Sequence, residues 1–100
     1  MLTDGARENL VEICERHGVE RLDLFGSAAG GNFDPDKSDL DFVLSFKPRT
    51  PARLFDRYFG LKEDLERLFG RDVDLLMEES MKNPYFAKSV NESRATLYAA

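Results

Sequence analysis

The stretch DLDFVLSF, residues 39–46, decides the fold, because a large apolar residue fills every second position. A period of two is typical of a β-strand that turns one face to the core. Asp39 and Asp41 are two positions apart, so both side chains leave the other face, with Cα atoms roughly 6.5–7 Å apart. The stretch therefore predicts a half-buried strand with a pair of carboxylates on one face.

Two further segments, residues 19–25 and 73–77, alternate in the same way. In the second, Val73 and Leu75 take the core side, as the same parity requires. Asp74 lies between them and therefore joins the face that carries the other acids. The sequence predicts three strands, with an apolar face toward the core and the acids on the other face.

Three longer segments place apolar residues at helical spacing. The predicted helices cover residues 3–17, 51–69 and 84–98. Gly18 and Gly70 follow the first two, where a left-handed residue often ends a helix, and Pro51 and Pro84 open the other two. Helices and short strands in this order predict an α+β fold, an α/β sandwich in which helices pack on one face of a small mixed sheet.

Length and composition limit the class of protein. The 100 residues suit a single domain, residues 1–100, and the net charge of −5 repels polyanions, so we expect no direct binding of nucleic acid. Cys14 is the only cysteine and makes no internal disulfide, and no apolar run approaches the roughly 20 residues of a membrane span. We therefore expect a cytoplasmic protein with no membrane partner, and association into homo-oligomers stays open.

Three carboxylates are the candidate catalytic and metal-binding residues: Asp39, Asp41 and Asp74. Two carboxylates about 4 Å apart repel by about 4 kcal/mol at an effective dielectric of about 20, so we expect a cation between them. Carboxylate oxygens favour Mg²⁺ or Mn²⁺, and two such ions can activate an attacking oxygen and stabilise leaving pyrophosphate. The three acids therefore indicate nucleotidyl transfer, whereas Asp23 and Asp72 are expected to be surface charges.

Gly26 and Ser27 come directly after the first predicted strand. Glycine permits a tight turn, and serine offers a hydroxyl and an N–H to phosphate oxygens. We expect this turn to bind the phosphates of a nucleotide. The small residues that follow, Ala28–Gly31, provide no cation, so a metal ion must neutralise the triphosphate.

Taken together, these motifs resemble those of a known family. The segments LFGS (24–27), SDLDFV (38–43) and VDLL (73–76) are similar to the minimal nucleotidyltransferases (MNT) of the polymerase-β-like superfamily. They look in particular like the MNT proteins that pair with HEPN-domain toxins in toxin–antitoxin operons. The resemblance covers most of the chain and implies the polymerase-β-like nucleotidyltransferase fold.

The resemblance also implies a role for each site residue. Asp39 and Asp41 would be metal ligands, and Asp74 would be the third carboxylate, which helps to activate the acceptor hydroxyl. Gly26 and Ser27 would contact the nucleotide phosphates. The implied activity is transfer of AMP from ATP to a protein hydroxyl, typically a tyrosine of the cognate HEPN toxin, which silences the toxin; the chain would then be an Mg²⁺-dependent antitoxin.

Two alternatives follow from the same sequence. Many family members have arginine where this chain has Gly30, which favours a catalytically weak or inactive antitoxin that neutralises a HEPN ribonuclease by binding it. The second alternative is a nucleotidyltransferase that acts on a small molecule. It requires a substrate pocket that a chain of this length does not build unaided.

Overall fold

The computed structural model describes residues 4–25, 40–48 and 53–100. Its elements, in chain order, are α1 (Asp4–Arg16), β1 (Val19–Phe25), β2 (Leu40–Phe46), α2 (Leu54–Phe69), β3 (Val73–Met77), the short 3-10 helix η1 (Glu78–Ser80), α3 (Pro84–Ser93) and β4 (Ala95–Ala99). The three strands expected from the alternating pattern are confirmed as β1, β2 and β3.

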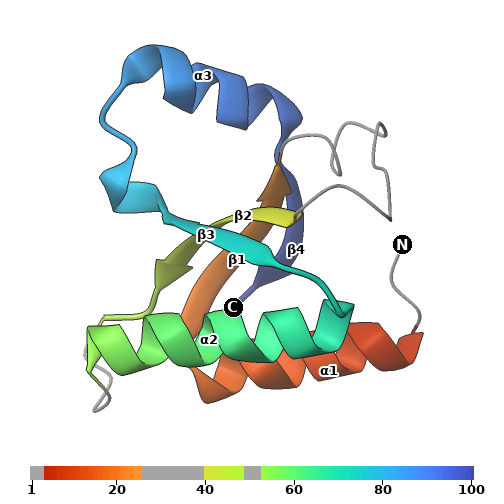
Figure 1. Cartoon of the computed structure of the whole chain (residues 1–100). Helices are drawn as coiled ribbons and strands as arrows, with labels where there is room; N and C mark the ends of the chain where they lie inside the picture. Colours follow the sequence, from red (N-terminus) through yellow and green to blue (C-terminus); the bar gives the residue numbers. More distant parts are fainter. Residues whose placement is uncertain (1–3, 26–39, 49–52) are drawn as a thin grey trace.

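The four strands form one mixed sheet in the order β3-β2-β1-β4. β1 is antiparallel to β2 and β4, whereas β2 and β3 are parallel. α1 and α2 lie side by side against one face of the sheet, and α3 lies on the other side (Figure 1). The predicted α+β fold with a small mixed sheet is confirmed, but the helices do not all pack on one face, because α3 lies on the opposite side of the sheet.

The core lies between the sheet and the layer of α1 and α2. It consists of apolar side chains that are less than a tenth exposed. They are Leu10, Ile13 and Cys14 of α1, Leu61 and Leu65 of α2, and Val19, Leu22, Leu24, Leu40, Phe42, Leu44, Val73 and Leu75 of the sheet. Burial, with a smaller effect of Glu15, raises the pKa of the Cys14 thiol to about 12. No helix in the described part of the chain is long and apolar enough to cross a bilayer.

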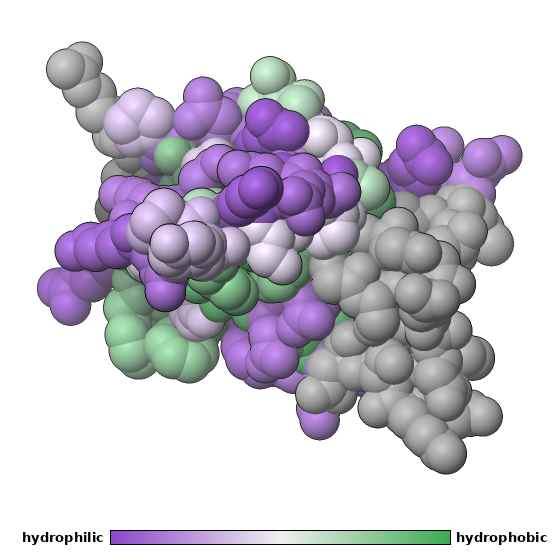
Figure 2. Space-filling model, turned by 90° about the horizontal axis from the view of Figure 1, so that it is seen from above, coloured by the Kyte–Doolittle hydropathy of each residue, from purple (hydrophilic) through white to green (hydrophobic). Residues whose placement is uncertain are grey.

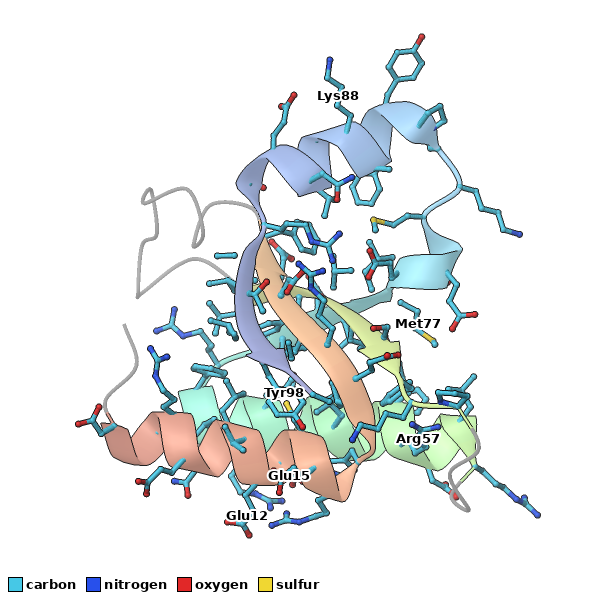
Figure 3. All side chains as sticks on the ribbon, turned by 180° about the vertical axis from the view of Figure 1, so that it is seen from behind. Glu12, Glu15, Arg57, Met77, Lys88 and Tyr98 are labelled. Carbon is cyan, nitrogen blue, oxygen red and sulfur yellow. The ribbon has the colours of Figure 1, made fainter. Side chains whose placement is uncertain are left out.

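The end of the chain differs from the prediction. The helix expected to run to residue 98 ends at Ser93, and β4 follows it and pairs with β1. Leu97 and Tyr98 are adjacent, yet both pack against the core, because the pairing with β1 shifts by one residue there. Tyr98 lies above α1 (Figure 3), and burial, followed by the charge of Glu15, raises its pKa. Leu97 and Tyr98 follow the apolar Val90 at a spacing typical of one face of a helix, so the sequence pattern predicts a helix where the bulged strand β4 lies.

The two later helices begin differently. α3 begins at Pro84 as predicted, and the side chain of Asn83 accepts hydrogen bonds from two amides of its first turn. α2 begins at Leu54 and not at Pro51, because Arg53 has an extended backbone. Pro51 itself lies outside the described residues.

Two side chains of α2 bind the outer edge of β3. The hydroxyl of Tyr58 donates a hydrogen bond of 2.7 Å to the carbonyl oxygen of Leu75. The carboxylate of Glu66 accepts one of 3.2 Å from the amide of Val73. Backbone groups on an edge strand otherwise attract strands of other chains. α2 therefore protects this edge as well as covering the core.

Asp23 is fully buried, so its prediction as a surface charge is wrong. Its carboxylate accepts hydrogen bonds from Arg94 Nε at 2.6 Å and from Arg21 Nε at 3.1 Å. Arg94 also donates to Glu78 at 3.0 and 3.3 Å and to Asn91 at 2.8 Å. The hydrogen bond to Glu78, and then the one to Asp23, raise the pKa of Arg94. The Arg94 guanidinium thus joins β1, η1 and the end of α3.

Gly60 lies where α2 passes the end of α1. A Cβ atom at this position would be only 2.8 Å from Cε1 of His17. The ring is held in place, because its Nε2 is 2.6 Å from the carboxylate of Asp64. The close approach of the two helices therefore requires glycine here.

We expect Gly60→Ala to destabilise the protein, although alanine is the better helix former by about 1 kcal/mol. Contact with the His17 ring costs more than this gain, and we expect a net loss of roughly 1 kcal/mol in the free energy of unfolding, measured in urea. Gly5→Ala in α1 is the control: nothing lies within 4 Å of its new Cβ, so this variant should be slightly stabilised. Equal stability of the two variants would contradict the close packing.

Arg94→Met is expected to destabilise the fold strongly, because, among the residues that the structure describes, it leaves the buried carboxylate of Asp23 with only the half-exposed Arg21 as partner. Breaking a buried ion pair costs about 3–5 kcal/mol, and we expect the lower end. The double variant Arg94→Met with Asp23→Asn removes the stranded charge and should recover part of the loss. If urea unfolding shows no recovery in the double variant, the buried charge is not the cause.

Candidate active site

Asp41 and Asp74 are neighbours in the sheet. They are paired directly in the parallel register of β2 and β3, and adjacent strands lie about 4.8 Å apart. Leu40 and Phe42, on either side of Asp41, are buried in the core against α1 and α2. Asp41 therefore leaves the opposite face, which is the side of α3, and so does Asp74. The structure brings these two predicted site residues together.

The other predicted site residues, Asp39, Gly26 and Ser27, lie outside the described part of the chain, and their roles stay predictions. Within residues 4–25, 40–48 and 53–100, no three His, Cys, Asp or Glu side chains gather into a metal-binding group. The pair formed by Asp41 and Asp74 is thus the described portion of the predicted three-acid site.

The donor chemistry at this pair fits a hard cation. Asp41 is half-buried and Asp74 is exposed, and both offer only oxygen. The single histidine and single cysteine of the sequence belong to the α1 layer, where Cys14 is fully buried and His17 is bound to Asp64. Neither the histidine nor the cysteine lies beside the acids, so the residues fit Mg²⁺ or Mn²⁺ better than zinc.

Phe25 completes the row of side chains that holds both acids. It is the β1 partner of Asp41 and so lies on the same face. Its ring meets the ring of Phe86 on α3 edge to face, with centroids 6.5 Å apart. Gly26, the first residue of the predicted phosphate turn, follows Phe25 in the sequence. An aromatic pair therefore borders the acids on the side of that turn.

Sequence reasoning missed two features of this face, the buried pair of Asp23 with Arg94 and the contact of Phe25 with Phe86. Both join β1 to the end of the chain, where the predicted helix hid a strand. The signal in the sequence is Arg94 itself, because it falls on the apolar stripe of the predicted helix, four positions after Val90. Its partner became identifiable only once β4 was placed beside β1.

Comparison of the chain with known proteins identifies its family. Residues 7–97 match the model of the nucleotidyltransferase domain. The candidate protein adenylyltransferase MJ0128 of Methanocaldococcus jannaschii is 35% identical over 91 residues, which cover 91% of this chain and 89% of that protein. The protein adenylyltransferase MntA of Thermococcus cleftensis is 39% identical over 72 residues, which cover 72% of this chain and 69% of that protein.

Solved structures agree with this result. A candidate minimal nucleotidyltransferase superposes with a TM-score of 0.73 at 32% identity, covering 91% of this chain and 88% of that one. The MNT antitoxin complex with a tri-AMPylated HEPN toxin of Shewanella oneidensis gives a TM-score of 0.64 at 16% identity, covering 99% and 74%, which shows a shared fold alone. The paired acids, the fold and the relatives agree, and the chain belongs to the nucleotidyltransferase domain family, among its minimal nucleotidyltransferases.

Proposed function

We propose that this chain transfers AMP from ATP to a hydroxyl group of a partner protein. The observation that carries the proposal is the direct pairing of Asp41 with Asp74, on a face that α1 and α2 leave uncovered (Figure 1). Relatives that match most of the chain bear the name protein adenylyltransferase, which favours AMP as the transferred group. Asp39, two positions before Asp41, is the proposed third carboxylate.

In the proposed reaction, the acceptor oxygen attacks the α-phosphorus of ATP in line with the departing pyrophosphate. A bond forms between this oxygen and phosphorus, the bond from phosphorus to the oxygen shared with the β-phosphate breaks, and Asp74 accepts the hydroxyl proton. Asp39 and Asp41 hold the metal site, while Gly26 and Ser27 donate hydrogen bonds to the phosphates. Mg²⁺ or Mn²⁺, when bound, neutralises the triphosphate and the leaving pyrophosphate.

The proposed acceptor is a tyrosine of a HEPN-domain toxin, and the proposed biological role is that of its antitoxin in the cytoplasm. The complex of an MNT antitoxin with an AMPylated HEPN toxin supports this as a precedent on the same fold. Attachment of AMP adds a bulky anion to the tyrosine and so can block the surface around it. Catalytic silencing of this kind does not require the two proteins to stay bound.

Asp41→Asn is expected to lower transfer of label from α-labelled ATP to the HEPN partner at least about a hundredfold, because a lost metal ligand removes several kcal/mol of charge stabilisation. Asp74→Asn and Asp39→Asn should have effects of similar size. Asp56→Asn removes an equal charge from the first turn of α2 and should leave transfer unchanged. Circular dichroism checks that each variant is folded.

Calorimetry with Mg-ATP separates this proposal from an antitoxin that acts by binding alone. Saturable binding that EDTA abolishes, together with loss of transfer in Asp41→Asn, is the expected result. An absence of binding at millimolar nucleotide, with tight binding to the toxin, would overturn the proposal in favour of the binding antitoxin that Gly30 suggests.

A further inference from the structure

Three residues of the C-terminal region form a stripe that faces the sheet. Phe86 and Val90 are four positions apart on α3, and Arg94 follows at the same interval as the helix ends. Phe86 meets Phe25, and Arg94 binds Asp23, so the two ends of the stripe are both fixed to β1. Lys88 points away from the sheet (Figure 3), which marks the opposite side of α3 as the solvent side.

Exposure along this stripe is uneven. Val90 is 2% exposed and the side chain of Arg94 is 13% exposed, whereas Phe86 is 45% exposed. A phenylalanine on the sheet-facing side of a helix is expected to be covered in the way Val90 is. The described surface seen from the side of α3 is mostly hydrophilic, with smaller hydrophobic areas (Figure 2). Phe86 thus stays nearly half exposed on the side of α3 that faces the sheet.

The position of this ring relates it to the acids. Phe25, its edge-to-face partner, is the β1 neighbour of Asp41, and Asp41 is the β2 neighbour of Asp74. Gly26 directly follows Phe25, so the predicted phosphate turn starts at the aromatic pair. Phe86 is therefore separated from the row of acids only by Phe25, and we expect a nucleotide with its phosphates at the acids to extend toward α3.

We infer that Phe86 is the stacking surface for the base of the nucleoside triphosphate, with Phe25 in edge-to-face contact with its ring. This inference rests on the proposed function and names the part of that site that recognises the base. A flat, uncharged ring provides stacking area and no hydrogen-bond pattern. Phe86 therefore favours the larger purine bases over pyrimidines, without separating adenine from guanine.

The sequence contains no tryptophan, so Phe86→Trp introduces the only tryptophan, at the proposed contact, and its emission can be excited selectively. We expect Mg-ATP and Mg-GTP to quench its emission saturably and Mg-CTP to do so only at higher concentration. The matched control is Phe55→Trp, which places the same fluorophore at an aromatic position of α2 that is 70% exposed. Its emission should not respond to nucleotide.

Phe86→Leu keeps an apolar side chain against Phe25 but removes the aromatic face. We expect it to raise the KM for ATP by about five- to a hundredfold, the range for loss of one stacked base, with kcat changed little. The preference for ATP over CTP should shrink in the same variant. Thermal unfolding confirms that Phe86→Leu is folded, and Phe86→Tyr, which keeps the ring, should restore KM.

Each outcome decides between the inference and the proposed function. If the wild-type chain binds Mg-ATP and Phe86→Leu binds it equally well, the stacking role is wrong while nucleotidyl transfer stands. Loss of toxin binding in Phe86→Leu at normal ATP affinity would assign Phe86 to the partner interface and would also overturn the inference. If the wild-type chain binds no nucleotide, the proposed function fails and the base site fails with it.

Discussion

Two carboxylates held side by side are the constraint on which the rest of this structure depends. The parallel register of β2 and β3 places Asp41 directly beside Asp74. Like charges directly opposite each other on neighbouring strands destabilise a sheet. A small domain has only about 5–15 kcal/mol in total, so the pair is tolerable where other contacts are strong and a cation can join the acids.

The two faces of the sheet have separate roles in meeting this constraint. One face gives the stability, because α1 and α2 bury a continuous apolar core against it, and Tyr58 and Glu66 of α2 also hold the edge of β3, the strand that carries Asp74. The other face carries the charges. On this face Arg94 binds Asp23 and so joins the end of α3 to β1. Asp23 lies two residues before Phe25, the β1 partner of Asp41, and therefore on the same face. The packed face thus holds in place the strands that carry the acids.

The sequence predicts what depends on local pattern, and it fails where contacts join distant segments. Alternation places β1, β2 and β3, and it assigns Asp41 and Asp74 to one face, but their direct pairing is a matter of register that no local pattern specifies. β4 was hidden because its bulge lets Leu97 and Tyr98 both face the core at helical spacing from α3. The prediction that Asp23 is a surface charge is wrong for the same reason, since its partner Arg94 lies directly before β4.

Paramagnetic broadening by Mn²⁺ in an amide NMR spectrum tests the central claim most directly, because it locates the cation without requiring activity. We predict that substoichiometric Mn²⁺ broadens the signals of Asp41 and Asp74 first. The signals of Glu12 and Asp64, acids of the α1 and α2 layer, should stay sharp. Broadening that begins at Glu12 or Asp64 while Asp41 and Asp74 stay sharp would contradict the account.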